Sequence, residues 1–328
     1  MTDTPFRWGI IGLGSIAHKF ATGLQAIPEA HLLAVASRSH DKAETFGERF
    51  GAGRRYGSYK ELAADPDVDA VYIATPHSGH EADSILCLEA GKAVLCEKPF
   101  AINEAQAQRM VDSARKYDAF LLEAMWTRFL PLIREVVKRV HDGAIGELRM
   151  IQADFGFRAG FDPNARLFDP ALGGGGLLDV GVYPISLASL LLGEPDRVTG
   201  LADIGQTGVD EQAGIVLGYP AGQIAVLSTG VRTNTLHEAT LLGTSGSIRI
   251  HSPWWVPTRF TLHANGHADE VVEMSFKGNG YNYEAVEVAT CVARGLKESP
   301  LLPLSETLSI LRTMDNLRSQ WGVKYPMD

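Results

Sequence analysis

Three short stretches of the sequence carry residues whose types and spacing are suited to chemistry. The first is a glycine-rich motif at residues 12–17, and the second is Lys98, which follows an apolar run. The third is the pair Asp179 and Tyr183, four positions apart behind four glycines. Lysine and tyrosine side chains can transfer protons, and a carboxylate can orient them. The combination favours proton transfer at an oxygen atom of a bound small molecule.

The glycine-rich motif reads Gly12-Leu13-Gly14-Ser15-Ile16-Ala17, a G-x-G-x-x-A pattern. Its first glycine permits a tight turn, its second lets the backbone approach a pyrophosphate, and its alanine keeps a helix close to a sheet. Ser15 and Ile16 begin that helix, whose N-terminal amides and dipole favour an anion. The motif predicts a dinucleotide-binding turn, and a plain tight turn is the alternative.

The end of the second apolar run indicates which dinucleotide is expected. A site for NAD usually has Asp or Glu there, which accepts hydrogen bonds from the ribose. Here Ser37 and Arg38 occupy the position, and no acid follows until Asp41. The guanidinium of Arg38 can pair with a 2′-phosphate and lie over the adenine. We therefore predict NADP as the cofactor, with a solvated surface arginine as the alternative.

The predicted catalytic residues are Lys98, Asp179 and Tyr183. Lys98 stands at the carboxyl end of an apolar strand, where open α/β sheets bind ligands, although a lysine that only extends into solvent is the alternative. Asp179 and Tyr183 share one face of a helix, although a glycine loop with an aspartate cap would look the same. We expect Tyr183 to exchange the proton, Lys98 to support it by its charge, and Asp179 to orient both. Alternatively, Lys98 itself holds the proton and Tyr183 positions the substrate.

These motifs, together with Thr75-Pro76-His77 and Glu97-Lys98-Pro99, make the chain resemble the Gfo/Idh/MocA family along essentially its whole length. This is the family of glucose-fructose oxidoreductase and inositol dehydrogenase. The resemblance implies hydride transfer between NAD(P) and a polyol, sugar or related secondary alcohol. Residues 123–129 and the stretch from Tyr283 to Gly322 more narrowly resemble dimeric dihydrodiol dehydrogenases and NADP-dependent xylose dehydrogenases. Tyr183 points away from inositol dehydrogenases, which often have His there.

The resemblance also supplies further candidates for cofactor contact. Thr75, Pro76 and His77 are predicted to border the nicotinamide ribose, and Glu97 is predicted to bind the cofactor beside Lys98. An ordinary strand stop before a proline is the alternative, and His80 is expected only to begin a helix. The ten histidines show no spacing typical of metal ligands, so we expect no metal site.

Candidates for substrate contact are less specific in their sequence pattern. Trp126 and Trp254 could wall an aromatic or sugar-stacking pocket, and a place in the core or an interface is the alternative for each. Arg166, like Arg128, is a candidate to reach substrate or cofactor, and a structural salt bridge is its alternative.

The elements that must position these residues form two patterns. Residues 1–124 alternate strands and helices, which predicts a Rossmann domain with a doubly wound parallel sheet. The expected strands are 7–11, 32–37, 70–74, 93–96 and 120–123, and the expected helices are 15–27, 42–50, 80–89 and 104–116. Residues 125–328 predict an α+β domain for substrate binding and oligomerisation, with a large, mostly antiparallel open sheet. Its expected strands are 147–157, 214–219, 223–231, 238–243, 247–251, 260–264 and 271–276, and its expected helices are 132–141, 283–298 and 305–321.

Composition restricts the partners. Thirty Lys and Arg against 39 Asp and Glu leave a net charge of −9, which gives no reason to expect nucleic acid or an anionic membrane. The apolar stretch Val182–Leu192 is about half the length needed to cross a bilayer. The three cysteines are odd in number and lack C-x-x-C spacing, so we expect them to be reduced thiols. The N-terminus is short and polar and does not resemble a signal peptide, so we expect a cytoplasmic protein. We expect a small-molecule substrate and a homodimer.

The leading functional hypothesis is an NADP-dependent dehydrogenase or reductase acting on CH–OH groups. One alternative is a glycosidase that oxidises its substrate transiently with a tightly held NAD, but Arg38 in place of an acid argues against it. Another alternative is a non-catalytic NADP sensor, which would not need Lys98, Asp179 and Tyr183 together. The sequence does not identify the substrate, because the shape of the substrate pocket depends on loops whose conformation cannot be predicted from it.

Overall fold

The computed structural model describes residues 5–328, which form two compact units. Unit 1 comprises the chain up to Trp126 together with Lys277–Thr307, and unit 2 comprises Thr127–Phe276 together with Leu308–Asp328. The sequence places everything after residue 124 in one second domain, whereas the structure returns Lys277–Thr307 to the first unit. The returning segment packs closely, since a Cβ atom on Gly23 would lie 3.1 Å from the backbone nitrogen of Asn282.

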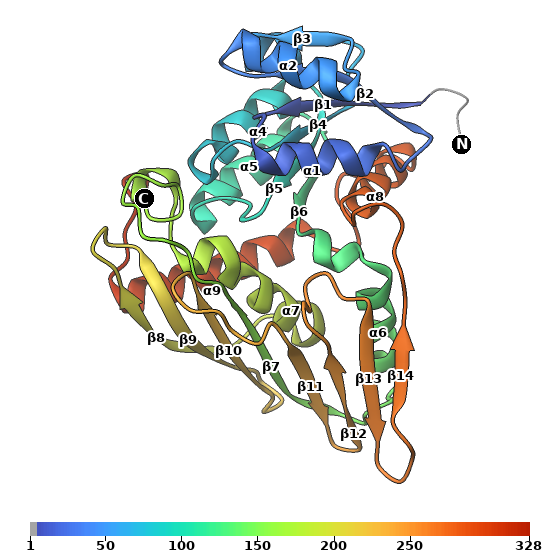
Figure 1. Cartoon of the computed structure of the whole chain (residues 1–328), viewed down its shortest axis with the longest axis vertical. Coiled ribbons are helices and arrows are strands. Elements are labelled where there is room, and N and C mark those ends of the chain that lie inside the picture. Colours follow the sequence, from blue (N-terminus) through green and yellow to red (C-terminus); the bar gives the residue numbers. More distant parts are fainter. Residues whose placement is uncertain (1–4) are drawn as a thin grey trace. The chain divides into compact units, whose positions relative to one another are not determined.

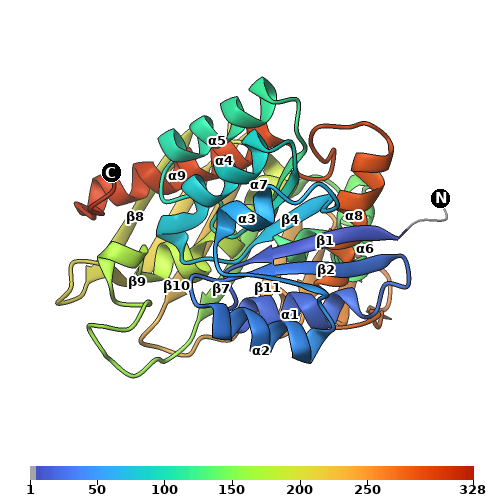
Figure 2. The same cartoon turned by 90° about the horizontal axis from the view of Figure 1, so that it is seen from above.

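Unit 1 is built on a six-stranded parallel sheet in the order β3-β2-β1-β4-β5-β6. Helices α1 and α2 cover one face, and α3, α4 and α5 cover the other (Figure 2), while α8 contacts α1. This confirms the predicted doubly wound Rossmann sheet. The strands are β1 (Phe6–Ile11), β2 (Ala30–Ala36), β3 (Arg54–Tyr56), β4 (Ala70–Ile73), β5 (Ala93–Glu97) and β6 (Leu121–Ala124). The helices are α1 (Ser15–Leu24), α2 (His40–Phe50), α3 (Tyr59–Ala63), α4 (His80–Glu89), α5 (Glu104–Lys116) and α8 (Asn282–Ala293).

Unit 2 is built on an eight-stranded sheet in the order β14-β13-β12-β11-β7-β10-β9-β8 (Figure 1). All neighbouring strands pair antiparallel except β7 and β10, which pair parallel, so the predicted mostly antiparallel sheet is confirmed. The strands are β7 (Leu148–Gly156), β8 (Arg197–Ile204), β9 (Asp210–Gly218), β10 (Ile224–Gly230), β11 (Ala239–Gly243), β12 (Gly246–Ile250), β13 (Arg259–Ala264) and β14 (Glu270–Glu273).

Helices cover only one face of this sheet in Figure 1: α6 (Pro131–His141), α7 (Val182–Leu192) and the part of α9 (Leu304–Trp321) that belongs to unit 2. The stretch Pro170–Leu192, which includes α7, is long and apolar enough to cross a membrane, but 83% of its most apolar window is buried. Within it, α7 lies in the core of unit 2 and contacts β7 and β10.

The carboxyl group of Asp210 is enclosed in the core of unit 2. Asp210 begins β9 and is 0% exposed, and its Oδ2 accepts a hydrogen bond of 2.7 Å from the backbone nitrogen of Leu177. Burial raises the pKa of Asp210 to about 7, although backbone amides at Leu177 and Gly176 and the charge of Arg318 act in the opposite direction. The side chain therefore retains a proton far above the usual range of a carboxylic acid.

This buried acid makes stability depend on pH. The folded protein keeps the Asp210 proton up to about pH 7, whereas the unfolded chain releases it near 3.8. Stability from this group is therefore complete below the lower value and is lost as pH rises through the higher one, by about 3 kcal/mol at most between pH 5 and 8. Urea denaturation should show a larger loss over this interval in the parent than in Asp210→Asn. Equal losses in the two proteins would contradict the assignment.

Candidate active site

The dinucleotide motif forms a turn that only glycine can make at its first position. Gly12 has a φ of +84°, and a Cβ atom there would lie 2.6 Å from the backbone nitrogen of Thr75. Gly14 precedes α1, and a Cβ atom there would meet nothing within 4 Å, which leaves the amides at the helix start accessible. Ala17 is fully buried between helix and sheet. The residues present fit a pyrophosphate in the way that the sequence predicts.

Ser37 and Arg38 follow β2 at the same edge of the sheet, because the parallel strands β1 and β2 end together. Ser37 is buried, and its hydroxyl accepts a hydrogen bond of 3.2 Å from the backbone nitrogen of Ser39. Arg38 is exposed. Burial raises the pKa of the neighbouring Tyr59, while the charge of Arg38 and its hydrogen bond lower it. Arg38 thus stands at the end of β2, as the sequence predicts, and its contact with a 2′-phosphate stays a prediction.

The loops after β4 and β5 are joined by a histidine that the sequence analysis expects only to begin a helix. His80 is buried, its Nδ1 lies 2.8 Å from the carbonyl oxygen of Pro99, and its Nε2 lies 3.0 Å from that of Thr75. The imidazole therefore ties together the Thr75-Pro76-His77 loop and the Lys98-Pro99 loop. Thr75 and His77 are buried, Pro76 is exposed and Lys98 is half-buried. The structure brings these predicted residues to one edge of the sheet in unit 1.

Glu97 turns into the interior of unit 1. Its carboxylate accepts hydrogen bonds from the Tyr72 hydroxyl and, at 3.1 Å, from the backbone nitrogen of Lys98. Burial raises the pKa of Glu97, while the charge of Lys98 opposes the shift. Glu284 on α8 is also fully buried, and burial together with the charge of Glu97 raises its pKa well above the usual range. Glu97 thus holds the backbone of the Lys98 loop by a hydrogen bond from inside the unit. Its contact with the cofactor stays a prediction.

Asp179 and Tyr183 lie on consecutive helical turns in unit 2. Asp179 belongs to the π-helical turn Leu177–Gly181, and Tyr183 lies in the first turn of α7. Both side chains are buried except for a small exposed part. Arg166 donates a hydrogen bond of 2.9 Å from Nη2 to Oδ1 of Asp179, so two of the predicted residues contact each other here. The pair is an ion pair, the alternative that the sequence left open for Arg166.

An aromatic cluster that the sequence analysis missed lies beside Tyr183. The Phe155 ring lies 5.2 Å from that of Tyr183 and stacks on Trp255 at 3.5 Å with an interplanar angle of 8°. His237 approaches Trp255 edge-on at 4.7 Å. We define these three residues, Phe155, Trp255 and His237, as the aromatic cluster. A stacked aromatic pair next to a phenol offers a flat surface for a ring-shaped substrate.

The structure corrects the prediction for Trp254. This residue is 0% exposed, and its indole nitrogen donates a hydrogen bond of 2.7 Å to the carbonyl oxygen of Asp154. It therefore belongs to the core, whereas the neighbouring Trp255 stacks on Phe155, the ring that lies 5.2 Å from that of Tyr183. Two adjacent tryptophans in an irregular segment give no period from which to tell the buried one from the other.

The other two candidates are packed within their own units. Trp126 is buried and stacks on Tyr281 at 4.5 Å with an interplanar angle of 12°, which favours a packing role in unit 1. Arg128 is buried in unit 2 and donates two hydrogen bonds of 2.9 Å to Ser186, to its hydroxyl and to its carbonyl oxygen. Ser186 lies on α7, so Arg128 fixes the helix that carries Tyr183.

Both units match known protein families. Residues 6–124 match an oxidoreductase family with an NAD-binding Rossmann fold, and residues 133–249 match the GFO/IDH/MocA C-terminal domain. The chain is 39% identical to trans-1,2-dihydrobenzene-1,2-diol dehydrogenase from Mus musculus, over 98% of each chain. It is 36% identical to the enzyme of that name from Homo sapiens, again over 98% of each chain.

Solved structures of similar fold agree with these matches. A 3-ketoreductase from Actinomadura kijaniata, in complex with NADP and TDP-benzene, is 28% identical with a TM-score of 0.86, over 96% of this chain and 98% of that one. An aldose-aldose oxidoreductase from Caulobacter crescentus is 26% identical with a TM-score of 0.87, over 95% and 96% of the two chains. Sequence and fold agree, and the chain belongs to the Gfo/Idh/MocA family of oxidoreductases.

Proposed function

We propose that this oxidoreductase transfers a hydride between NADP and a ring-shaped secondary alcohol, or the corresponding carbonyl compound, of the dihydrodiol, sugar or polyol type. The observation that carries the proposal is the Tyr183 phenol beside the stacked pair Phe155 and Trp255. Aromatic faces pack against a flat unsaturated ring or against the C–H face of a sugar. Similar proteins are named as dihydrodiol dehydrogenases, as a 3-ketoreductase and as an aldose-aldose oxidoreductase, which supports this range of substrates.

The residues of unit 1 suit NADP as the cofactor. The turn at Gly12 and Gly14 leaves the helix-start amides open for the pyrophosphate, and Arg38 is available for the 2′-phosphate. Buried His80 holds the two loops at the sheet edge where the nicotinamide half is expected. When bound, NADP supplies the donor or acceptor of the hydride.

Proton transfer is assigned to residues of the chain itself. Tyr183 holds the proton that leaves or joins the substrate oxygen, and the ammonium of Lys98 favours the charged state of the phenol. Asp179, fixed by its ion pair with Arg166, orients the set. In the alternative assignment, Lys98 holds the proton and Tyr183 positions the substrate. The variants Tyr183→Phe and Lys98→Met distinguish the two assignments.

The first prediction of this proposal concerns cofactor choice. Removing the guanidinium in Arg38→Ala should weaken NADP binding on the order of tenfold or more, or roughly 1.4 kcal/mol. NAD binding should stay the same, because NAD has no 2′-phosphate. Titration calorimetry with both cofactors measures the effect, and Arg49→Ala on the exposed side of α2 is the matched control. Unchanged NADP affinity in Arg38→Ala would reject the role of Arg38.

The second prediction concerns the proton. Tyr183→Phe should lower turnover of trans-1,2-dihydrobenzene-1,2-diol or an aldose with NADP by roughly 10²–10⁴, while NADP binding persists. Lys98→Met should do comparable damage. The assay follows NADPH by absorbance across a panel of dihydrodiols, aldoses and polyols. If Tyr183→Phe turns over normally and Lys98→Met is inactive, the lysine holds the proton.

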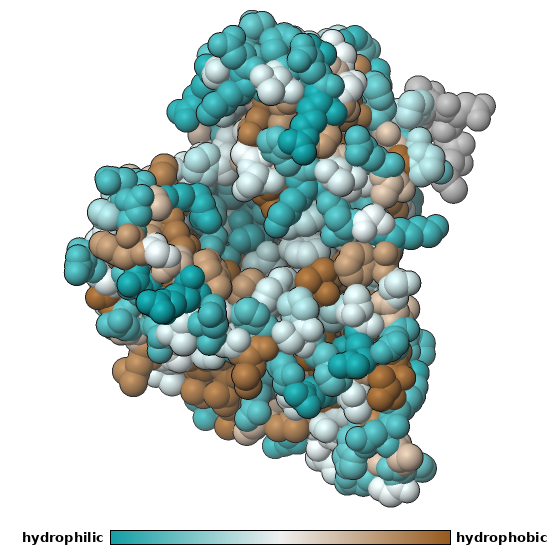
Figure 3. Space-filling view, in the orientation of Figure 1, coloured by the Kyte–Doolittle hydropathy of each residue, from teal (hydrophilic) through white to brown (hydrophobic). Residues whose placement is uncertain are grey.

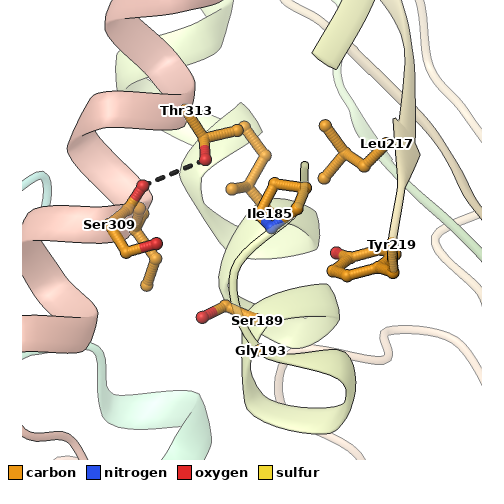
Figure 4. A pocket seen from close by; sticks show the side chains of 9 residues that line it. Ile185, Ser189, Gly193, Leu217, Tyr219, Ser309 and Thr313 are labelled. Atoms are coloured by element: carbon orange, nitrogen blue, oxygen red, sulfur yellow. Dashed lines mark hydrogen bonds between the residues drawn. The ribbon is translucent and has the colours of Figure 1, made fainter. Parts of the chain in front are cut away.

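Tyr219→Phe is the matched control for this experiment. Tyr219 is a buried phenol of the same unit, and it lines a separate small cavity with Ile185 and Leu217 (Figure 4). Among the residues that the structure describes, its hydroxyl has no hydrogen-bond partner. Removing that hydroxyl should leave turnover unchanged. A parent protein that retains its cofactor and shows no net change in NADPH would instead favour the glycosidase alternative.

We also propose a cytoplasmic homodimer. The cysteines are free and buried, which suits a reducing compartment. The uncovered face of the unit 2 sheet carries exposed apolar side chains on neighbouring strands, including Leu201 at 85%, Val226 at 41% and Val216 at 40% exposed. Val226 and Val216 are direct cross-strand partners. Apolar residues gather over β8 to β10 at the lower left of Figure 3, and a second copy is the partner we propose for this face.

The third prediction concerns this dimer. Sedimentation at micromolar concentration should give twice the 35.5 kDa mass of the chain. Val226→Lys should shift the particle to the monomer, because a charge would be buried at the interface. Val286→Lys, an equally exposed apolar position on α8 of unit 1, should leave the mass unchanged. A parent protein that sediments as a monomer would contradict the proposal.

A further inference from the structure

The glycine loop before Asp179 is held by side chains from separate parts of unit 2. The Tyr325 hydroxyl donates a hydrogen bond of 2.6 Å to the carbonyl oxygen of Gly174. The Thr229 hydroxyl, on β10, donates one of 3.3 Å to the carbonyl oxygen of Gly176. Both side chains are buried, so two loop carbonyls find their donors inside the protein rather than in water.

The third contact comes from β9. Asp210 accepts the backbone N–H of Leu177 at 2.7 Å, and the loop lies directly against its carboxyl group. Gly175 has a φ of +110°, and a Cβ atom there would lie 2.5 Å from Oδ1 of Asp210. The loop therefore has neither the conformation nor the space for a side chain at this point.

The phenol of Tyr325 is itself fixed by a charged group. The guanidinium of Arg318 lies 5.0 Å above the Tyr325 ring, and it forms salt bridges of 2.9 Å with Asp328 and 2.7 Å with Asp315. The Tyr325 backbone nitrogen donates a further hydrogen bond of 2.8 Å to Asp328. The segment after α9 is thus anchored on that helix and holds a single hydroxyl against the loop.

The held loop leads into the proposed catalytic residues without an intervening flexible segment. Leu177 begins the π-helical turn that contains Asp179, and α7 with Tyr183 follows it directly. The backbone nitrogen of Asp179 also donates a 3.3 Å hydrogen bond to the carbonyl oxygen of Gly175. A shift of the loop must therefore move Asp179, and a displacement of about 1 Å at a reacting group can cost roughly 10² in rate.

We propose that Asp210, Thr229 and Tyr325 form a clamp that positions Asp179 and Tyr183 for proton transfer. The clamp is defined as the three hydrogen bonds between these side chains and the backbone of residues 174–177, of which Thr229 and Tyr325 donate two and Asp210 accepts one. Asp210 is fully enclosed, so it acts through the loop and does not contact the substrate. The proposal rests on the proposed function, because it takes Tyr183 as the group that exchanges the proton.

Kinetics of four single variants test the clamp. Asp210→Ala removes the acceptor for the Leu177 amide and should lower kcat by roughly 10² with little change in KM. Asp210→Asn keeps an oxygen at that place and should recover most of the activity. Tyr325→Phe removes one hydroxyl and should lower kcat several-fold, whereas Tyr219→Phe, the matched buried phenol, should not. Normal kcat in both Asp210→Ala and Tyr325→Phe would overturn the proposal.

Backbone hydrogen exchange separates this inference from the proposed function. Mass spectrometry of peptides covering residues 173–181 should show faster exchange in Asp210→Ala and Tyr325→Phe than in the parent or Tyr219→Phe. Parent-like exchange in both variants would overturn the clamp, even where no substrate has been found. Faster exchange with unchanged kcat would overturn the positioning role. If Asp210→Ala does not fold, Tyr325→Phe decides, and absence of turnover in the parent counts against the proposed function alone.

Discussion

At Gly12 and Gly175 the backbone lies so close to another part of the protein that there is no room for a Cβ atom. The proposed cofactor binding depends on the first of these contacts, and the proposed proton transfer depends on the second. At Gly12 the neighbour is the backbone of Thr75, so the cofactor motif and the loop after β4 are packed against each other. At Gly175 the neighbour is the carboxyl group of Asp210. The turn at Gly12 comes just before the amides that begin α1, and the turn at Gly175 comes just before the helical turns that contain Asp179 and Tyr183.

Most of unit 1 is predictable because its strands are continuous apolar runs separated by amphipathic helices. The exceptions are β3 and α3, which the sequence analysis misses. Strand β3 has only three residues, two of them arginines, and Arg54 is stabilised there by ion pairs with Asp65 and Asp67. In unit 2 the missed strand is β8, in which Gly200 sits under Trp321 and Leu201 is exposed, so it lacks a regular apolar alternation. The return of α8 to unit 1 has no local signal, since tertiary packing decides it.

The candidate site likewise contains residues that can be predicted from local sequence and contacts that cannot. Gly12, Gly14 and Arg38 are predictable because a turn, a helix start and a strand end lie within a few residues of one another. The contacts of His80, Asp210 and Tyr325 are not, because their partners are 19, 33 and 151 positions away in the sequence. Trp254 and Trp255 show the same limit, because they are adjacent in the sequence but contact Asp154 and Phe155 on β7, 100 positions away.

The stacking of Trp255 on Phe155 gives the protein an optical property. Trp255 is half-buried and stacks on Phe155, the ring next to Tyr183. Trp8, Trp126 and Trp254 are buried, and Trp321 is half-buried with its indole nitrogen hydrogen-bonded to the carbonyl oxygen of Gly200. The emission of an indole responds to the polarity of its surroundings, so a ring that displaces water from this face would change the Trp255 fluorescence while the enclosed indoles stay constant. Binding of a ring on the face of Phe155 and Trp255 can thus be followed without turnover, by a chromophore that the chain already contains.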